Sequence, residues 1–190
     1  IILEQCIDAG LRKFYISVHY LSQKIIDHFG NGDKWGVKIQ YLHESKPLGT
    51  GGALSLLPED LNYPLLTING DILTKFNINE LLNYHEQNNA YCTVTAREYE
   101  SKIPFGVIEH EGIVLKIIVE KPTNKYFVNA GVYAFSPEVL KILQPGKTID
   151  MPDLINLIKD AQKKIIICPI HEYWIDIGRI ETLKKAHQSW

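Results

Sequence analysis

Two aspartates follow apolar segments at places where a carboxylate can meet a ligand. Asp71 ends the segment YPLLTINGD (63–71), and Asp176 lies in YWIDIG (173–178), just before a predicted helix. Ligands of open α/β sheets bind beyond the carboxyl ends of strands, and Mg2+ prefers one or two carboxylates together with phosphate oxygens. Each aspartate by itself is explained equally well as a turn residue or a helix cap. Together they allow a shared Mg2+ site, which we state as a hypothesis.

A glycine-rich segment, PLGTGGAL (47–54), follows a predicted strand. Glycines let a backbone turn sharply or pass close to a flat ligand. The segment is not a P-loop, because no Gly-Lys-Ser/Thr follows, and it does not match the G-x-G-x-x-G pattern of dinucleotide-binding folds. It therefore indicates either a ligand-binding turn or a plain strand-to-helix turn.

Charged and amide side chains mark two further predicted strands. Glu120-Lys121-Pro122 ends one strand, and Asn129 precedes Ala130-Gly131 in the next. Lys121 could meet a phosphate as a point charge, while Glu120 and Asn129 carry groups that can bind sugar hydroxyls. The simpler explanation is an exposed ion pair at a strand end, which is the commoner fate of such residues.

The overall composition excludes several classes of function. With a formal net charge of -2, the chain has no basic field for nucleic acid or an anionic membrane. Its longest apolar runs are too short to cross a bilayer. The cysteines lie far apart with no C-x-x-C pair, and the histidines show no metal-ligand spacing. We expect a cytoplasmic protein with reduced thiols and no partner among nucleic acids or membranes.

Hydrophobic spacing predicts an α/β fold whose two halves differ. In the first half, strands alternate with helices, which is typical of a parallel sheet with right-handed crossovers. After an opening helix, we predict strands at 13–19, 37–44 and 63–71, and helices at 21–32, within 49–60 and at 78–89. In the second half we predict strands at 90–98, 105–110, 113–121, 127–135 and 163–170, and helices at 136–144, 151–161 and 179–189.

Taken together and in order, these segments resemble the sugar-1-phosphate nucleotidyltransferase family. The resemblance covers essentially the whole chain, since LTINGDIL, FGVIE, VEKP, VNAGVYAF and YWIDIG follow residues 18–54 in family order. Each motif alone is weak, whereas the ordered set is specific. The chain is most similar to the mannose-1-phosphate guanylyltransferase-like branch, which includes bacterial enzymes acting on heptose or amino-sugar phosphates for surface glycans.

The resemblance implies a Rossmann-like mixed, mainly parallel sheet flanked by helices, the nucleotide-diphospho-sugar transferase fold, with residues 1–190 as one domain. It also implies that this domain is incomplete at its N-terminus. The family's first strand, its Gly-rich loop with an arginine and the lysine that follows are not present. Because that loop would hold the triphosphate, we expect the 190-residue chain by itself to be inactive. Gly51 stands where the family more usually has alanine.

The functional residues of the family carry over position by position. The implied catalytic residues are Asp71, Lys121 and Asp176, of which the two aspartates would bind Mg2+ and the lysine would hold the phosphate of the sugar. The implied nucleotide-binding residues are Glu44, Gly49, Thr50 and Gly51. The implied sugar-binding residues are Gly106, Glu120 and Asn129.

The implied reaction transfers a nucleoside monophosphate from a nucleoside triphosphate to a sugar 1-phosphate, with Mg2+ as cofactor and pyrophosphate as the second product. Glu44 lies where pyrimidine-using relatives place a glutamine. An ionised carboxylate only accepts hydrogen bonds, so it suits the adjacent N1-H and N2-H2 donors of guanine. We therefore expect GTP as the donor.

Other functions stay open from the sequence. The base could be thymine or uracil instead of guanine. A retaining glycosyltransferase is disfavoured, because Asp71-Ile72-Leu73 lacks the second aspartate of a D-x-D motif. A non-catalytic module that binds sugar nucleotides or regulates a partner is the alternative outside enzymes, and a homo-oligomer is also left open.

Overall fold

The structure is a computed structural model that describes residues 1–178 and 180–189. The first half of the chain alternates between strands and helices, as the hydrophobic spacing predicts. Its elements are α1 (Ile2–Asp8), β1 (Lys13–Val18), α2 (Ser22–Phe29), η1 (Asp33–Trp35), β2 (Lys38–His43), α3 (Gly49–Gly52), η2 (Ala53–Leu56), β3 (Leu65–Ile68), β4 (Ile72–Thr74) and α4 (Ile78–Gln87). Asn77 caps α4 by accepting a hydrogen bond from the Asn79 N–H.

The second half contains the successive strands that the sequence predicts. Its elements are β5 (Cys92–Lys102), β6 (Gly106–Glu111), β7 (Val114–Glu120), β8 (Thr123–Phe135), η3 (Pro137–Lys141), α5 (Met151–Asp160), β9 (Ile165–Ile170), β10 (Trp174–Asp176) and α6 (Ile180–Ser189). The helix expected at 136–144 is only the short 3-10 helix η3. Residue 179, expected to begin the last helix, lies outside the described residues. None of the helices in the described part of the chain is long and apolar enough to cross a lipid bilayer.

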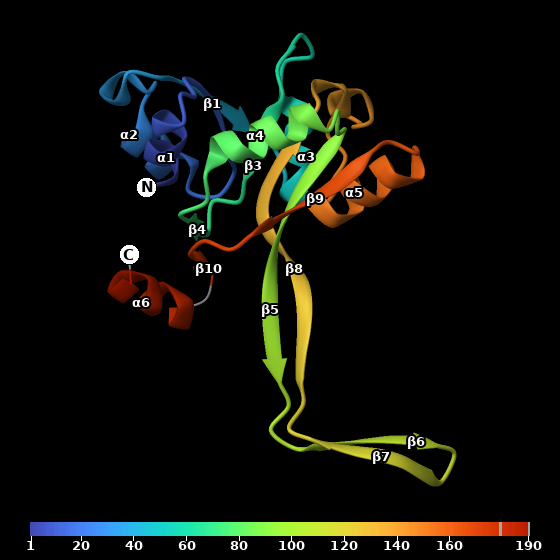
Figure 1. Cartoon of the computed structure of the whole chain (residues 1–190). Helices are drawn as coiled ribbons and strands as arrows, with labels where there is room; N and C mark the ends of the chain where they lie inside the picture. Colours follow the sequence, from blue (N-terminus) through green and yellow to red (C-terminus); the bar gives the residue numbers. More distant parts are fainter. Residues whose placement is uncertain (179, 190) are drawn as a thin grey trace.

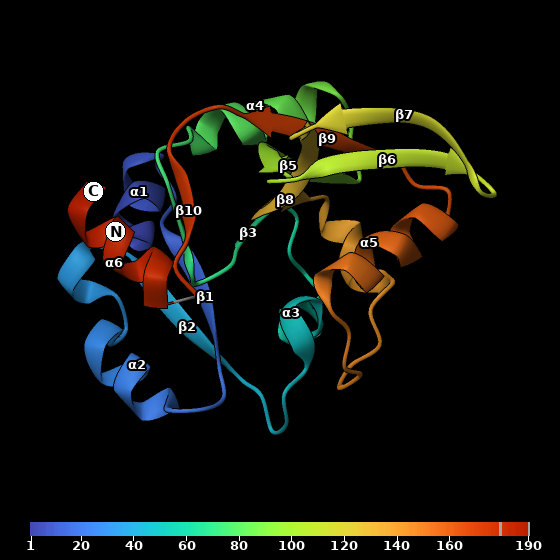
Figure 2. The same cartoon turned by 90° about the horizontal axis from the view of Figure 1, so that it is seen from below.

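The strands confirm a mixed α/β architecture. In the described residues, β3, β8, β5 and β9 form a four-stranded sheet in that order, and three further strand pairs are β1–β2, β4–β10 and β6–β7. The pairs β1–β2 and β5–β9 are parallel, and the others are antiparallel, so the pairing is mixed as expected but has fewer parallel pairs than a mainly parallel sheet. Figure 2 shows α1, α2 and α6 grouped around β1 and β2, with α3 and α5 on the side of the molecule that carries the β6–β7 hairpin.

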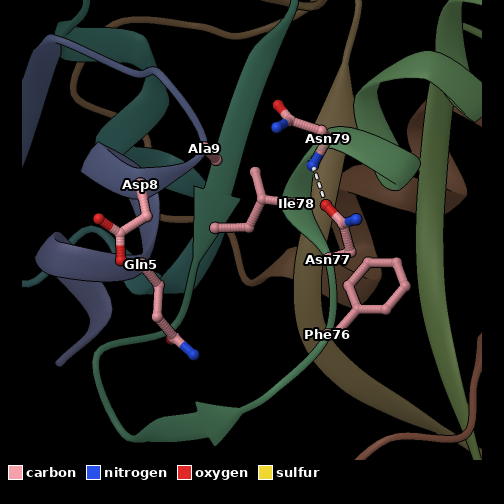
Figure 3. A pocket seen from close by; sticks show the side chains of 7 residues that line it. All are labelled: Gln5, Asp8, Ala9, Phe76, Asn77, Ile78 and Asn79. Atoms are coloured by element: carbon pink, nitrogen blue, oxygen red, sulfur yellow. Dashed lines mark hydrogen bonds between the residues drawn. The ribbon is translucent and has the colours of Figure 1, made fainter.

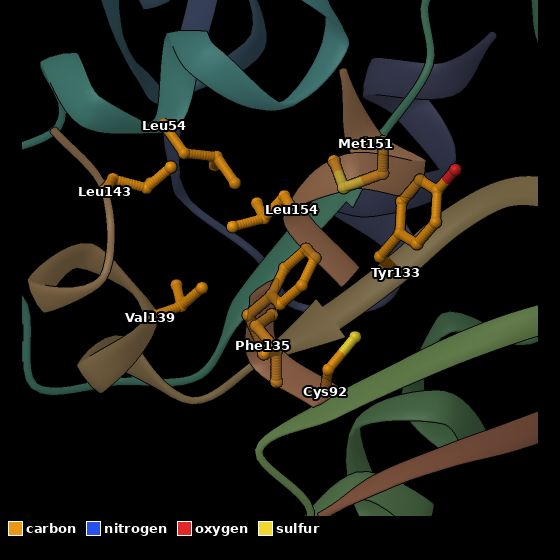
Figure 4. Packing of buried hydrophobic residues seen from close by; sticks show 9 residues of the cluster. Leu54, Cys92, Tyr133, Phe135, Val139, Leu143, Met151 and Leu154 are labelled. Carbon is orange, nitrogen blue, oxygen red and sulfur yellow. The ribbon is translucent and has the colours of Figure 1, made fainter. Parts of the chain in front are cut away.

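One hydrophobic cluster fixes α5 to the central sheet. Tyr133 and Phe135 of β8 are 1% and 0% exposed, and they pack with Met151 and Leu154 of α5 (Figure 4). The two aromatic rings stack with centroids 6.0 Å apart. Full burial of side chains of this size stabilises a fold by about 1.5–3 kcal/mol each. The N-terminus of α5 is therefore held firmly against the sheet.

A second cluster holds the short strands in place. Ile72 of β4 and Leu81 of α4 pack against Ala130 and Val132 of β8, with Trp174 of β10 partly buried beside them. Both short strands, missed by hydrophobic spacing because three residues are too few to show alternation, border the candidate aspartates. This cluster therefore positions the polypeptide on either side of Asp71 and Asp176.

The outer parts of β5 and β8 form an arm that leads from the body to the β6–β7 hairpin (Figure 1). Residues 98–102 of β5 pair with 123–127 of β8 along the arm. Every residue of β7 is exposed, and among them are Leu115, Ile117 and Ile118. The hairpin carries Gly106 and Glu120 at its base, so two of the three candidate sugar-binding residues lie where the arm meets the hairpin, whereas Asn129 lies further along β8 in the body.

Candidate active site

Asp71 lies in the turn between β3 and β4, beyond the carboxyl end of β3. A hydrogen bond to β8 holds the turn: the Asn69 N–H donates to the Gly131 carbonyl at 2.9 Å. The Ile72 N–H donates back to the Asn69 carbonyl at 3.2 Å, which closes the turn. The backbone on both sides of the carboxylate is thus fixed by hydrogen bonds.

Antiparallel pairing of β4 with β10 brings Asp176 to the same place. Asp176 is the partner of Ile72 in this ladder, and the Ile177 N–H donates to the Asp71 carbonyl at 2.8 Å. A Cβ atom added at Gly178 would lie 3.0 Å from Asp176 Oδ1 and 3.1 Å from Asp71 Oδ2. Because both oxygens lie so near one point, they are roughly 6 Å apart at most.

The two carboxylates fit a hard divalent cation. Oxygen ligands from one or two carboxylates, completed by phosphate and water, are what Mg2+ prefers, at about 2.1 Å. Gly178 leaves open the space that a side chain would fill, and its N–H donates to Asp176 Oδ1 at 2.7 Å. Within residues 1–178 and 180–189, no group of three or more His, Cys, Asp or Glu side chains gathers around a potential metal position, so any further ligands would have to come from substrate or water.

A kink in β8 joins these segments. Gly131 has φ +73, and a Cβ atom there would lie 2.8 Å from Ile72 Cγ1, so a larger residue would push β4 away. The indole N–H of Trp174 donates to the Ala130 carbonyl at 2.7 Å. The segment Asn129-Ala130-Gly131 of β8 therefore contacts the end of β3, the start of β4 and the start of β10, and holds these strands together.

Asn129 is placed by the same kink. Its amide Oδ1 accepts the Gly131 N–H at 3.0 Å, and its Nδ2 donates to the Tyr133 hydroxyl at 2.6 Å. Burial raises the pKa of Tyr133, while the hydrogen bond from Asn129 acts in the opposite direction. The Asn129 side chain is thus held in one orientation although the residue itself is exposed.

Glu44 braces the glycine-rich turn. Its carboxylate accepts the Leu48 N–H through Oε2 at 2.7 Å, and Oε1 accepts the Ser17 hydroxyl of β1. The N–H groups of Gly51 and Gly52 both donate to the Ile149 carbonyl at 3.0 Å. Since these donors point inward, the turn is not built like a phosphate-binding loop, whose N–H groups face the anion. Ser17 was not among the residues that the sequence singled out, because nothing local marks a serine in mid-strand.

Two candidate sugar-binding residues, Gly106 and Glu120, form a separate group with Lys121 at the base of the hairpin. Gly106 is the cross-strand partner of Glu120, and a Cβ atom at Gly106 would lie 3.0 Å from Glu120 Oε2. Lys121 has the left-handed φ of +46, and its Nζ lies 3.7 Å from Glu120 Oε1. A long side chain rarely adopts positive φ, and such strained residues concentrate at functional sites.

The structure therefore places the predicted residues in three groups. Glu44 and the Gly49–Gly52 turn form the first, Asp71, Asp176 and Asn129 the second, and the hairpin base the third. In the described ranges no hydrogen bond or ion pair joins one group to another. The predicted sugar-binding set is therefore divided, with Asn129 beside the aspartates and Gly106 and Glu120 at the hairpin base.

Two surface cavities lie elsewhere. One of about 250 Å³ separates α1 from the start of α4, and its lining includes Gln5, Asp8 and Phe76 (Figure 3). Another of about 360 Å³ lies between η2 and η3. Neither is lined by a residue of the three groups, and the first has only one ionisable side chain, so neither replaces the aspartate pair as the candidate centre.

Comparison with known proteins decides the family. The profile of the family described as "Nucleotidyl transferase" matches residues 1–190. The chain belongs to the nucleotidyl transferase family. Two similar relatives are the catalytic subunits beta of mannose-1-phosphate guanylyltransferase from Danio rerio, 29% identical over 187 residues, and Dictyostelium discoideum, 31% identical over 187 residues. Each match covers 93% of this chain and 51% of the relative, so the chain spans about half the length of these nucleotidyltransferases.

Solved structures share the nucleotidyl transferase fold. HddC from Yersinia pseudotuberculosis superposes with a TM-score of 0.74 at 21% identity, covering 98% of this chain and 82% of HddC. The same protein complexed with GMP-PN gives 0.73. A putative glucose-1-phosphate thymidylyltransferase from Bacillus anthracis also gives 0.73, at 20% identity, covering 98% of this chain and 79% of that one. The expected fold class is thereby confirmed.

Proposed function

We propose that the protein containing this chain transfers a nucleoside monophosphate from a nucleoside triphosphate to a sugar 1-phosphate and releases pyrophosphate. The observation that carries the proposal is the pair of carboxylates beside Gly178, in a chain of the nucleotidyl transferase family. The NDP-sugar product would serve surface glycan synthesis. The three free cysteines agree with a cytoplasmic location, which is also part of the proposal.

The reaction needs positioning and charge neutralisation more than covalent help. An oxygen of the sugar phosphate attacks the α-phosphorus in line with the departing pyrophosphate, and no protein nucleophile is needed. Asp71 and Asp176 would hold Mg2+, which when bound supplies charge neutralisation between the two anionic substrates. The rigid backbone around both aspartates keeps the carboxylates in one arrangement while substrates come and go.

The hairpin base would receive the sugar 1-phosphate. Lys121 projects from a strained backbone position beside Glu120, and its ammonium can orient the attacking phosphate as a point charge. Glu120 would accept hydrogen bonds from sugar hydroxyls at the hairpin base, and Asn129, which lies beside the aspartates, would contact hydroxyls from that side. Gly106 keeps the adjacent strand free of a side chain that would press on the Glu120 carboxylate.

We further propose guanine as the preferred base. An ionised carboxylate has about four acceptor sites on its two oxygens, so Glu44 can keep the hydrogen bonds from Ser17 and Leu48 and still accept the paired donors of guanine. Uracil or thymine would turn a carbonyl oxygen toward the same carboxylate, which is costly. The similarity to mannose-1-phosphate guanylyltransferases favours the same base. Gly49, Thr50 and Gly51 would form the wall on which the base lies.

The test is a substrate panel on the full-length protein. GTP, UTP, dTTP and CTP are each combined with mannose, glucose and heptose 1-phosphates, and pyrophosphate release is followed with Mg2+ present. We expect GTP to give the highest kcat/KM. Asp71→Asn and Asp176→Asn should each lower kcat/KM about 100-fold or more, because the bound metal contributes several kcal/mol of charge stabilisation. The control Asp60→Asn changes an exposed carboxylate elsewhere and should leave kcat/KM unchanged. Absence of pyrophosphate release with every pair would refute the proposal.

A further inference from the structure

Asp150 stands at the N-cap of α5 but does not cap it. An aspartate at this position ordinarily accepts an N–H from the second or third residue of its own helix. Asp150 has the extended backbone of an N-cap residue, with φ -84 and ψ 157, yet its side chain makes no such hydrogen bond. Its Oδ1 instead accepts the N–H of Thr50 at 3.2 Å. A carboxylate well placed for its own helix is thus used on the glycine-rich turn.

Thr50 returns the contact. Its hydroxyl accepts the N–H of Met151, the first residue of α5, at 2.8 Å. The two segments therefore exchange hydrogen bonds much as a capping box does within one helix. Because the Thr50 hydroxyl and N–H are both engaged, the Thr50 side chain has a bracing role in this structure.

The neighbouring backbone completes the junction. The Ile149 N–H donates to the Leu48 carbonyl at 2.8 Å, and the Ile149 carbonyl accepts from Gly51 and Gly52. At Gly49, which has φ +78, a Cβ atom would lie 2.6 Å from Asp150 Oδ1 and 2.6 Å from the Ile149 carbonyl oxygen. The Asp150 carboxylate and the Ile149 carbonyl therefore fill the space that a side chain at position 49 would need, so only glycine fits there.

The junction rests on a rigid base. Met151 is 1% exposed and packs in the cluster that fixes α5 to the sheet (Figure 4). Asp150 immediately precedes it, so its carboxylate is held against a buried anchor. On the other side, Glu44 holds the Leu48 N–H. The turn is thereby clamped between two carboxylates, one before it and one from α5.

We propose that Asp150 is a positioning residue for the nucleoside triphosphate, holding the Gly49–Gly52 turn in the shape that receives the base without touching the nucleotide itself. This inference rests on the proposed function of the turn. It assigns Asp150 a role in nucleotide affinity and none in the sugar phosphate site, which lies in a separate group of residues.

The test compares Asp150→Ala, Asp150→Asn and the matched control Asp153→Ala in the full-length protein. Asp153 is exposed in the first turn of the same helix, so its loss makes the same charge change near the helix N-terminus. Asp150→Ala should raise the KM for GTP about tenfold, equivalent to about 1.4 kcal/mol, with kcat and the KM for the sugar phosphate within about twofold. Asp150→Asn keeps an acceptor oxygen, so its KM for GTP should stay close to that of wild type. Asp153→Ala should have the wild-type KM for GTP.

Each outcome separates this inference from the proposed function. If wild type transfers no nucleotide, the proposed function fails. If wild type is active and Asp150→Ala leaves the KM for GTP unchanged, or raises the KM for GTP and the KM for the sugar phosphate alike, the positioning role is wrong. Should Asp150→Ala fail to fold, Asp150→Ser decides, because serine can still cap α5 but lacks the carboxylate that accepts the Thr50 N–H: a selective rise in the KM for GTP supports the role, and no rise overturns it.

Discussion

The carboxylates of Asp71 and Asp176 both border the small space left open by Gly178, where an added Cβ atom would lie 3.1 Å from Asp71 Oδ2 and 3.0 Å from Asp176 Oδ1. Two oxygens bound to one Mg2+ are at most about 4.2 Å apart, so only a small side-chain adjustment separates the observed arrangement from joint coordination. The pairing of β4 with β10 is what brings these distant parts of the sequence together.

This relationship predicts the behaviour of a metal probe. Mn2+ titrated into the full-length protein and followed by its electron paramagnetic resonance signal should bind wild type more than tenfold more tightly than Asp71→Asn or Asp176→Asn. Gly178→Ala should also weaken binding, because its methyl group would occupy the space between the carboxylates. Equal Mn2+ affinity in all four proteins would show that these residues do not share a metal.

Two glycines in one turn should respond oppositely to alanine. Gly49 has φ +78 and no room for a Cβ atom, and the left-handed backbone alone costs a non-glycine residue about 1–2 kcal/mol. Gly51 lies in α3, and its added Cβ would make only ordinary contacts at 3.4 Å. Gly49→Ala should therefore lower the free energy of unfolding by more than about 2 kcal/mol, while Gly51→Ala should raise it by about 0.4–1 kcal/mol. Urea denaturation of both variants distinguishes the two responses, and equal effects would mean that the turn is not shaped as described.

Glu44→Gln should change the base preference without loosening the turn. A glutamine carbonyl can still accept the Leu48 N–H, and the Ser17 hydroxyl can accept from the new amide. Loss of the acceptor pair for guanine should cost roughly 1–3 kcal/mol of binding free energy, which lowers kcat/KM for GTP more than tenfold near the middle of that range. Ser17→Ala is the control for bracing alone and should affect all nucleotides alike. An unchanged GTP preference in Glu44→Gln would remove the carboxylate from base recognition.

His85 should make the fold sensitive to acid. It is 2% exposed and lies with Nδ1 2.8 Å from the Thr93 hydroxyl. Burial lowers the pKa of His85, with nearby Glu86 acting in the opposite direction. The unfolded chain therefore binds a proton first, so the contribution of His85 to stability is complete above about pH 6.5 and is lost as the pH falls below it toward the folded-state pKa. Urea unfolding at pH 7.5 and 5.5 gives the free energy of unfolding at each pH. Its decrease at pH 5.5 should be smaller in His85→Gln than in wild type, and equal to that of wild type in the control His43→Gln, which changes an exposed residue.

Most of the fold could be predicted because apolar spacing repeats over long elements. The helix at α4, with Asn77 as its cap, and the strands from β5 to β8 lie close to their expected ranges. The three-residue strands β4 and β10 could not be found this way, and their pairing depends on tertiary contacts with β8. That pairing is what turns two separate strand-end aspartates into neighbours.

The sequence marks candidate residues by charge and by family resemblance, and the structure places two of them, Asp71 and Asp176, side by side; their roles stay predictions. Asp71, Asp176 and Lys121 stand out by charge beside apolar strands. The bracing contacts of Ser17 and Asp150 were not predictable, because Asp150 before Met151-Pro152 has the pattern of an ordinary helix cap and nothing in the sequence links it to Thr50. The structure reveals that link only by placing α5 against the turn.

The most direct test of the account follows the fate of labelled phosphorus. The full-length protein is incubated with Mg2+, mannose 1-phosphate and GTP labelled either at the α-phosphate or at the γ-phosphate, and the products are separated. Nucleotidyl transfer predicts that the α-label appears in an NDP-sugar and the γ-label in pyrophosphate, with both signals lost in Asp71→Asn. Appearance of the γ-label in the sugar product, or release of inorganic phosphate without any NDP-sugar, would contradict the account.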